Sequence, residues 1–277
     1  MNLSTYRYHI GFLLITVVLF LNHSNAATGD TTTLLANNAK TLAPVSEIII
    51  TKPSNITYPS LLEKHRQQTI GYVEKISNKK RAYLIHTYNA GQKFFPKISA
   101  ILKSYQLPPE LKVLIALESG FNGNAVSPAG AVGYWQLMDA AAKEHGLKIS
   151  NGTKVKGKMR QCDERKNLSK STYAAAKYLR EGAANLNDDI LLTVASYNCG
   201  IGKVRSAMKQ SGKSDAGFWD IKKYLPAETR NYVMNFIALN VIFDNYDKFV
   251  KNNLVFTPVV QTIKVTEPAE DPIDATL

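Results

Sequence analysis

The sequence has few of the patterns that mark metal-binding or nucleic-acid-binding proteins. It holds five histidines among 277 residues, and none pairs with another at the spacing of a metal site. No lysine and arginine run is longer than the one within Asn78–Arg81, and no nucleic-acid-binding motif is present. We therefore expect no metal, no cofactor and no nucleic-acid partner.

Long apolar runs are also missing, because the longest, Ile10–Leu21, has only about a dozen residues and a bilayer span needs ~20. Arg7 and His9 precede this run, and Ser24-Asn25-Ala26 after it resembles a small-residue cleavage site. Residues 1–26 therefore read as a secretory signal, with an uncleaved membrane anchor as the alternative. No cysteine lies near the site, which excludes lipoprotein processing. We expect an exported chain with no stable membrane span after signal cleavage.

The composition is that of one globular domain with tails. Apolar residues make up 45% of the chain, which is enough for a core, and the formal net charge is +12. A basic chain of this kind can bind nucleic acid, an anionic membrane or an anionic polymer, and the charge alone does not choose among them. We expect a lead-in segment at residues 27–60, a helical domain at 61–250 and a tail at 251–277, with short strands at 48–50 and 259–265.

The stretch from Leu111 to Leu137 carries the first candidate for chemistry. Pro109 suits the first position of a helix, apolar residues follow at helical spacing, and Gly120 suits its end. Glu118 falls on the apolar stripe in the last turn, where desolvation and the helix dipole both raise the pKa of a carboxyl. That environment suits a general acid, although a structural or solvent-facing glutamate remains the alternative.

Four motifs extend this stretch in a fixed order: Glu118-Ser119, Gly133-Tyr134-Trp135-Gln136, Ser196-Tyr197-Asn198-Cys199-Gly200 and Glu228-Thr229-Arg230-Asn231-Tyr232. Together they resemble the family 1 lytic transglycosylases, bacterial enzymes that cleave peptidoglycan on a goose-lysozyme-like fold. The resemblance covers roughly residues 79–247 and departs from the usual pattern at Ser196 and Cys199, where smaller residues are common.

The resemblance implies a mainly α-helical, lysozyme-like (goose-type) domain with extended N- and C-terminal tails. It also implies cleavage of the β-1,4 bond between N-acetylmuramic acid and N-acetylglucosamine, with a 1,6-anhydro product, in the periplasm or cell envelope of a bacterium. The expected partner is the peptidoglycan glycan strand, and the expected state is a monomer. Glu118 would be catalytic; the substrate-binding or orienting residues would be Ser119, Gln136, Tyr197, Asn198, Glu228 and Tyr232.

Within this scheme Tyr197 would orient Glu118, and the side chains of Gln136, Asn198 and Tyr232 would hold sugar groups. Glu228 also suits the positive end of a helix dipole, so capping is its second reading. Trp135 is assigned to the core in preference to a sugar platform.

Two rival functions remain open. The first is a hydrolytic lysozyme that uses Asp163 or Glu164 as a second carboxylate, because ordinary glycosidases need two. The second is a catalytically inactive peptidoglycan-binding protein, which the retention of Glu118 together with Tyr197 disfavours.

The remaining pattern predicts further helices and one loop. Residues 147–168 are polar and read as an exposed loop, and residues 226–247 are apolar almost all round, which is typical of a buried helix. The expected shorter helices are residues 138–145, residues 172–187 capped by Ser169 or Ser171, and residues 190–197 capped by Asp188 or Asp189 and ended by Gly200.

The two cysteines, Cys162 and Cys199, both fall inside the predicted domain of an exported chain. Export to an oxidising compartment favours a disulfide between them, and two separate buried thiols are the alternative.

Overall fold

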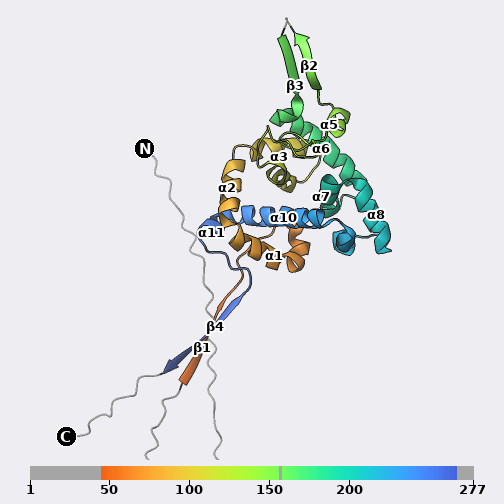
Figure 1. The fold of residues 1–277 in the computed structure, drawn as a ribbon. Helices are drawn as coiled ribbons and strands as arrows, with labels where there is room; N and C mark the ends of the chain where they lie inside the picture. Colours follow the sequence, from red (N-terminus) through yellow and green to blue (C-terminus); the bar gives the residue numbers. More distant parts are fainter. Residues whose placement is uncertain (1–44, 156–157, 267–277) are drawn as a thin grey trace, which may run out of the picture. The chain divides into compact units, whose positions relative to one another are not determined.

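The structure is a computed structural model that describes residues 45–155 and 158–266. The predicted signal at residues 1–26 and the end of the tail lie outside the described residues. Contacts divide the chain into two units, which are residues Ile56–Leu254 and the segments that flank them. The larger unit is built of helices, which confirms the mainly α-helical prediction (Figure 1).

The helices of the larger unit follow one another through short connections. Most are shorter than four turns, and the longest are α6 and α10. In chain order they are η1 (Ser60–His65), α1 (Arg66–Lys79), α2 (Arg81–Gly91), α3 (Phe95–Ser104), η2 (Pro109–Val113), α4 (Leu114–Ser119), α5 (Asp139–Glu144), η3 (Glu164–Lys166), α6 (Leu168–Ala184), α7 (Ile190–Cys199), α8 (Ile201–Ser211), α9 (Phe218–Ile221), η4 (Lys222–Tyr224), α10 (Ala227–Asp244) and α11 (Tyr246–Val250).

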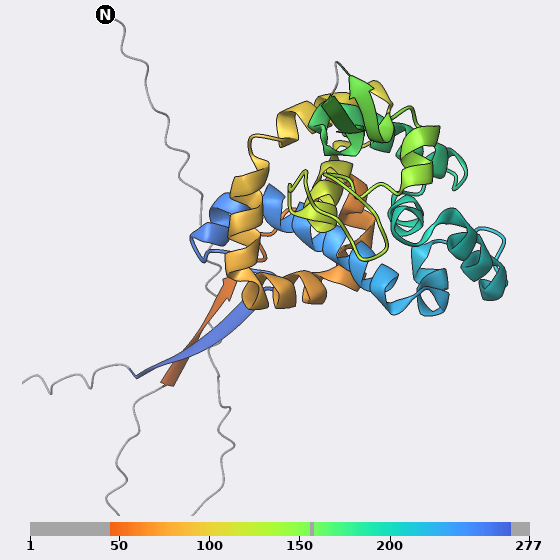
Figure 2. The same ribbon diagram turned by 45° about the horizontal axis from the view of Figure 1, so that its top comes forward.

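Helix α10 forms the centre of the core. Its side chains are apolar on nearly every face, and Val233, Phe236 and Ile237 are fully buried. A helix of this composition is stable only when neighbours cover it, and α1, α4 and α7 all pack against α10. The prediction of a buried helix is confirmed, and Pro226 stands at its N-cap. Figures 1 and 2 show α10 crossing the middle of the helical unit.

Local capping explains where α6 and α7 begin. The Asp189 carboxylate accepts a hydrogen bond from the backbone N–H of Leu192 at 2.9 Å, and Gly200 follows the helix at φ +83°, as predicted. The predicted cap of α6 is wrong. Asn167 caps this helix by accepting from the N–H of Lys170 at 3.0 Å, so α6 begins before Ser169 and Ser171.

The predicted loop at residues 147–168 is wrong, because the chain forms a hairpin there. Strands β2 (Ile149–Val155) and β3 (Lys158–Asp163) pair antiparallel, with an irregular register between Ser150 and Thr153. Lysines and a glycine give these segments little intrinsic preference for strand. The pairing across the hairpin therefore defines the strands, and such pairing is not visible in a local pattern.

The smaller unit contains a two-stranded ribbon. Strand β1 (Val45–Lys52) pairs antiparallel with β4 (Val259–Thr266), and Ile48 lies opposite Ile263. Next to the ribbon, the N–H of Asn55 donates to the carbonyl of Val255 at 3.0 Å. Both predicted strands are thereby confirmed.

Candidate active site

Glu118 lies one residue before the end of α4. The segment that precedes it starts as a 3₁₀ turn at Pro109 and becomes α-helical at Leu114, and Gly120 ends the helix at φ +57°. A left-handed conformation at this position favours glycine, because a side chain would be strained there. Glu118 therefore lies in the last turn of α4, directly before the glycine-rich loop.

The Glu118 carboxyl is in an environment that favours its neutral form. The residue keeps intermediate exposure, but its carboxyl group lies deep among its neighbours. Burial raises the pKa of Glu118 to about 7, a hydrogen bond from Tyr232 opposes this, and the charge of Glu228 adds to it. The predicted rise in pKa is confirmed, with desolvation as the main cause.

Tyr232, which α10 carries, is the residue that contacts this carboxyl. Its hydroxyl donates a hydrogen bond to Oε1 of Glu118 at 2.5 Å. Burial and the adjacent Glu118 charge raise the pKa of Tyr232 well above the usual value, so this hydroxyl stays protonated and remains a donor. The contact joins residues 114 positions apart in the chain.

Tyr232, and not Tyr197, makes the hydrogen bond to Glu118 in this structure, and the expected orienting role of Tyr197 stays a prediction. The Tyr197 hydroxyl donates to the backbone carbonyl of Trp135 at 2.7 Å, so it stabilises the loop that contains Trp135. The Glu118 carboxyl is bonded by Tyr232. Glu118 is still near enough to contribute to the raised pKa of Tyr197. The two tyrosines therefore flank the site with different tasks.

The loop between α4 and α5 is fixed by its own side chains. Ser119 donates from Oγ to the carbonyl of Tyr134 at 2.7 Å, and its expected role toward the substrate stays a prediction. Gln136, at φ +48°, donates from Nε2 to the carbonyls of Gly133 at 2.9 Å and Ala125 at 3.1 Å. The amide nitrogen of Gln136 is therefore engaged within the protein, and the expectation that this side chain holds a sugar stays a prediction.

Trp135 belongs to the core, as predicted. Its side chain is fully buried, and Nε1 donates to Oγ1 of Thr172 at 2.9 Å. Gly133, two residues earlier in the same loop, packs closely against the backbone of Arg165, because a Cβ atom there would stand 2.1 Å from the carbonyl oxygen of Arg165. Packing on both sides gives the loop a single position beside Glu118.

Asn198 and Glu228 lie at two helix ends near the site. Oδ1 of Asn198 accepts a hydrogen bond from Oγ1 of Thr229 at 2.8 Å, which ties the end of α7 to the start of α10. Glu228 is exposed in the first turn of α10, at the positive end of its dipole. Its charge acts on Glu118, and a role in sugar binding remains a prediction for both residues.

Comparison with known proteins shows what this chain is similar to. Residues 95–217 match the Transglycosylase SLT domain. The resemblance that the four motifs indicated is thereby confirmed, and the matched residues include Glu118 and Tyr197 but end before Tyr232.

Relatives of this SLT region carry related names. The chain is 33% identical over 172 residues to membrane-bound lytic murein transglycosylase D of Escherichia coli strain K12, a match that covers 61% of this chain and 35% of that protein. It is 29% identical over 158 residues to membrane-bound lytic murein transglycosylase F of Actinobacillus succinogenes, covering 52% of this chain and 30% of that protein. The chain thus spans about a third of the length of these relatives.

A solved structure similar to this chain is the lytic transglycosylase Slt of Pseudomonas aeruginosa, as an inactive mutant. The identity is 23%, the match covers 58% of this chain and 24% of that chain, and the TM-score is 0.44.

The two carboxylates proposed as a second catalytic group are already paired. Asp163 binds Arg165 through both oxygens, at 2.9 and 2.7 Å, and this lowers the pKa of Asp163. Glu164 binds the ammonium of Lys170 at 2.5 Å and the backbone N–H of Lys148 at 2.8 Å, which lowers the pKa of Glu164. Neither group has the raised pKa or the contact with Glu118 that a base in this site would need.

The structure contradicts the predicted disulfide. Cys162 is an exposed free thiol on β3, and Cys199 is a half-buried free thiol at the end of α7. The sequence predicted an exposed loop around Cys162, whereas pairing with β2 holds Cys162 opposite Ser150.

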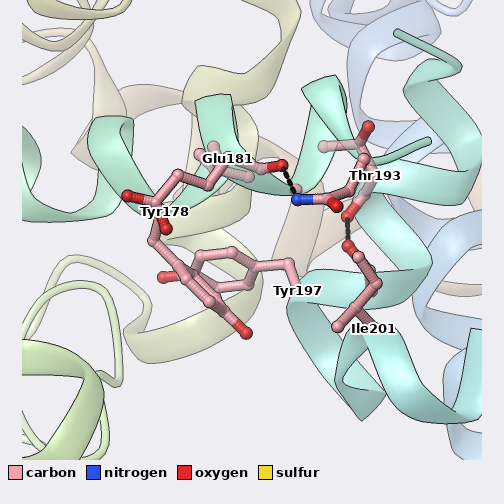
Figure 3. A pocket seen from close by; sticks show the side chains of 9 residues that line it. Tyr178, Glu181, Thr193, Tyr197 and Ile201 are labelled. Carbon is pink, nitrogen blue, oxygen red and sulfur yellow. Dashed lines mark hydrogen bonds between the residues drawn. The ribbon is translucent and has the colours of Figure 1, made fainter. Parts of the chain in front are cut away.

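A cavity of about 110 Å³ opens behind Tyr197, between α6, α7 and α8. Figure 3 shows Tyr178 beside Tyr197, and Glu181 and Thr193 also line the cavity. The centroids of the two tyrosine rings lie 5.5 Å apart. Sequence reasoning missed Tyr178, since a tyrosine in the middle of a helix carries no local signal of a site. Glu118 does not line this cavity.

Proposed function

We propose that this chain is a peptidoglycan lytic transglycosylase that cleaves the β-1,4 bond between N-acetylmuramic acid and N-acetylglucosamine. The observation that carries the proposal is the Glu118 carboxyl, buried, bonded to Tyr232 and with its pKa raised to about 7. A group with this pKa is present in both protonation states near neutral pH, so it can serve first as an acid and then as a base.

Glu118 acts in both steps of the reaction. In the first, protonated Glu118 gives its proton to the glycosidic oxygen as the bond from that oxygen to C1 of the muramic acid breaks. In the second, ionised Glu118 takes the proton of the C6 hydroxyl as O6 forms a bond to C1. The product carries a 1,6-anhydro ring, no water is consumed, and Glu118 returns to its protonated state.

Tyr232 and the loop support these two steps. The hydrogen bond to Oε1 fixes one carboxyl oxygen and leaves Oε2 to carry the proton that is transferred. The same bond stabilises the ionised form that exists between the steps, and so keeps the pKa from rising further. Tyr197 contributes indirectly, because it fixes the loop through the Trp135 carbonyl.

The place of action follows from the same proposal. Murein is found outside the bacterial cytoplasmic membrane, so the chain would act in the periplasm or cell envelope, as a monomer. No helix within residues 45–155 or 158–266 is both long enough and apolar enough to cross a bilayer.

Product analysis on purified sacculi tests the proposal. The chain and its Glu118→Gln variant are incubated separately with sacculi, and the released muropeptides are analysed by mass spectrometry. We expect anhydro-terminated muropeptides from the wild type and none from the variant. Reducing-end muramic acid as the main primary product would make the enzyme a hydrolase, and binding without any release would make the chain an inactive wall-binding protein.

A further inference from the structure

A groove lies at the end of α10 that is farther from Tyr232. It has a volume of about 330 Å³, and its lining includes Tyr88, Phe95, Lys112 and Asp244. We name it the distal groove. Figure 1 shows α2 and α11 at this end of α10. Tyr232 and Asp244 are twelve positions apart on α10, which is about 18 Å along the helix axis, so the distal groove is separate from the candidate active site.

Three aromatic rings form one wall of the distal groove. The rings of Tyr88 and Phe243 meet edge to face with centroids 5.2 Å apart, and the centroids of Phe95 and Phe243 are 5.9 Å apart. Gly91 makes room for this arrangement, because a Cβ atom there would overlap the Phe95 ring. The wall is apolar, so it can cover the carbon chain of a small ligand.

Asp244 brings a carboxyl group to the distal groove in an unfavourable setting. It is the last residue of α10, where the carbonyl end of the helix dipole disfavours a negative charge. Partial burial raises the pKa of Asp244, the charge of Lys112 opposes this, and the charge of Glu110 adds to it. Within residues 45–155 and 158–266, no hydrogen bond or ion pair satisfies the Asp244 carboxyl. The residue is exposed, so a cation from outside can reach it and offset these effects.

Lys112 supplies the opposite charge in the same groove. Its Nζ lies 5.6 Å from the centroid of the Phe95 ring, a cation–π contact. Among the residues that the structure describes, no carboxylate forms an ion pair with Lys112. The distal groove therefore holds one carboxylate and one ammonium that both keep their capacity for charged hydrogen bonds.

We propose that the distal groove binds an amino acid group, in which one carbon carries both an ammonium and a carboxylate. The ammonium of the ligand bonds to Asp244, its carboxylate bonds to Lys112, and its side chain lies against the aromatic wall. A ligand with a single charge would leave one group of the groove without a partner, whereas a ligand with both charges satisfies the two groups together.

Two sources can present this group. One is a free amino acid, and the other is the end of a peptide, such as a peptide stem of peptidoglycan. The proposal goes beyond the proposed function and does not depend on it, because it concerns binding without cleavage.

The test is an NMR titration of the full chain with ligands that share one carbon chain. Norleucine carries both charges, pentylamine carries only the ammonium, and hexanoate carries only the carboxylate. A purified muropeptide whose stem ends in a free amino and a free carboxyl group is the fourth probe, and it represents the peptide source.

Two variants remove the charges of the groove, Asp244→Asn and Lys112→Gln. The matched control variants, Asp215→Asn and Lys97→Gln, remove the same charges from exposed positions that do not line the distal groove. Circular dichroism checks that all four variants keep the fold.

We expect norleucine to bind at least roughly tenfold more tightly than pentylamine or hexanoate, because only norleucine makes both charged hydrogen bonds. Asp244→Asn and Lys112→Gln should each weaken this binding by about the same factor, and added salt should weaken it in the wild type. The control variants should bind as the wild type does. Norleucine that binds as tightly as the muropeptide identifies a free amino acid as the ligand, and binding of the muropeptide alone, weakened by Asp244→Asn, identifies the end of a peptide.

Three results would overturn the proposal. They are binding of norleucine that is no tighter than that of pentylamine or hexanoate, equal binding by the groove variants and the controls, and no binding of either norleucine or the muropeptide. Because a muropeptide can also occupy the Glu118 site, its binding supports the proposal only where Asp244→Asn lowers it. Failure of the proposed function is a separate result, since it would appear as missing anhydro products.

Discussion

Replacing Tyr232 with phenylalanine should raise the pKa of Glu118 further. The Tyr232 hydroxyl donates to Oε1 of Glu118 at 2.5 Å, and this bond lowers the pKa of a carboxyl that burial raises. A hydrogen bond to a charged group contributes ~1.5–3 kcal/mol, and one pKa unit corresponds to ~1.4 kcal/mol. The neutral acid keeps part of this hydrogen bond, so only part of its free energy separates the two protonation states. We therefore expect the pKa of Glu118 to rise by about one unit, from about 7 toward 8.

The assay is a carbon NMR titration of the Glu118 carboxyl, with the pH dependence of cleavage as the second readout. The limb of the pH profile that reports Glu118 ionisation should move up with the NMR value. Tyr197→Phe is the matched control, because the Tyr197 hydroxyl donates to the Trp135 carbonyl and makes no bond to the carboxyl. A pKa in Tyr232→Phe that stays constant or falls, or an equal rise in Tyr197→Phe, would refute the assignment of Tyr232.

Glu118→Gln should lower cleavage by at least ~10²–10⁴-fold while the fold persists, measured by muropeptide release and circular dichroism. The pKa of Glu118 is about 7 in the folded chain and 4.5 in the unfolded chain, so ionisation of Glu118 destabilises the fold. The free energy of unfolding of the wild type should therefore fall relative to that of this variant as the pH rises from 4.5 to 7, by up to about 3 kcal/mol. Melting temperatures of the two proteins that change in parallel across this range would contradict this prediction. Gly133→Ala should lower the free energy of unfolding, measured with urea, far more than Gly130→Ala. Both glycines have a positive φ, +84° and +85°, but only at Gly133 would the added Cβ atom meet a carbonyl oxygen. Ellman's reagent should count two thiols after unfolding, with Cys162 reacting first in the native chain and Cys199 slowly.

Local chemistry in the sequence was enough for much of the helical framework. Asp189 and Gly200 mark the ends of α7, and the apolar stripe placed Glu118 beside other buried residues, so its raised pKa was predictable. These are properties of neighbouring residues, and the sequence displays neighbours directly. The order of the motifs then indicated the family.

The hydrogen-bond partner of Glu118 shows what a local pattern does not contain. Both Tyr197 and Tyr232 lie in motifs of the family, and either hydroxyl was compatible with contact. The choice depends on the tertiary packing, which brings the Tyr232 hydroxyl of α10 to the carboxyl on α4 and the Tyr197 hydroxyl of α7 to the Trp135 carbonyl. The hairpin was missed for a related reason, because its strands are defined by each other and by no periodicity of their own.

The ribbon of β1 and β4 has a consequence for how the helical unit can be used. The chain enters this unit at Ile56 and leaves it at Leu254, and the flanking residues Asn55 and Val255 are hydrogen-bonded to each other. A module whose two ends meet can be inserted into a surface loop of a host protein without stretching either partner. Its ends can equally be linked and a new opening made in another loop, so the helical unit is a candidate for transplantation and circular permutation.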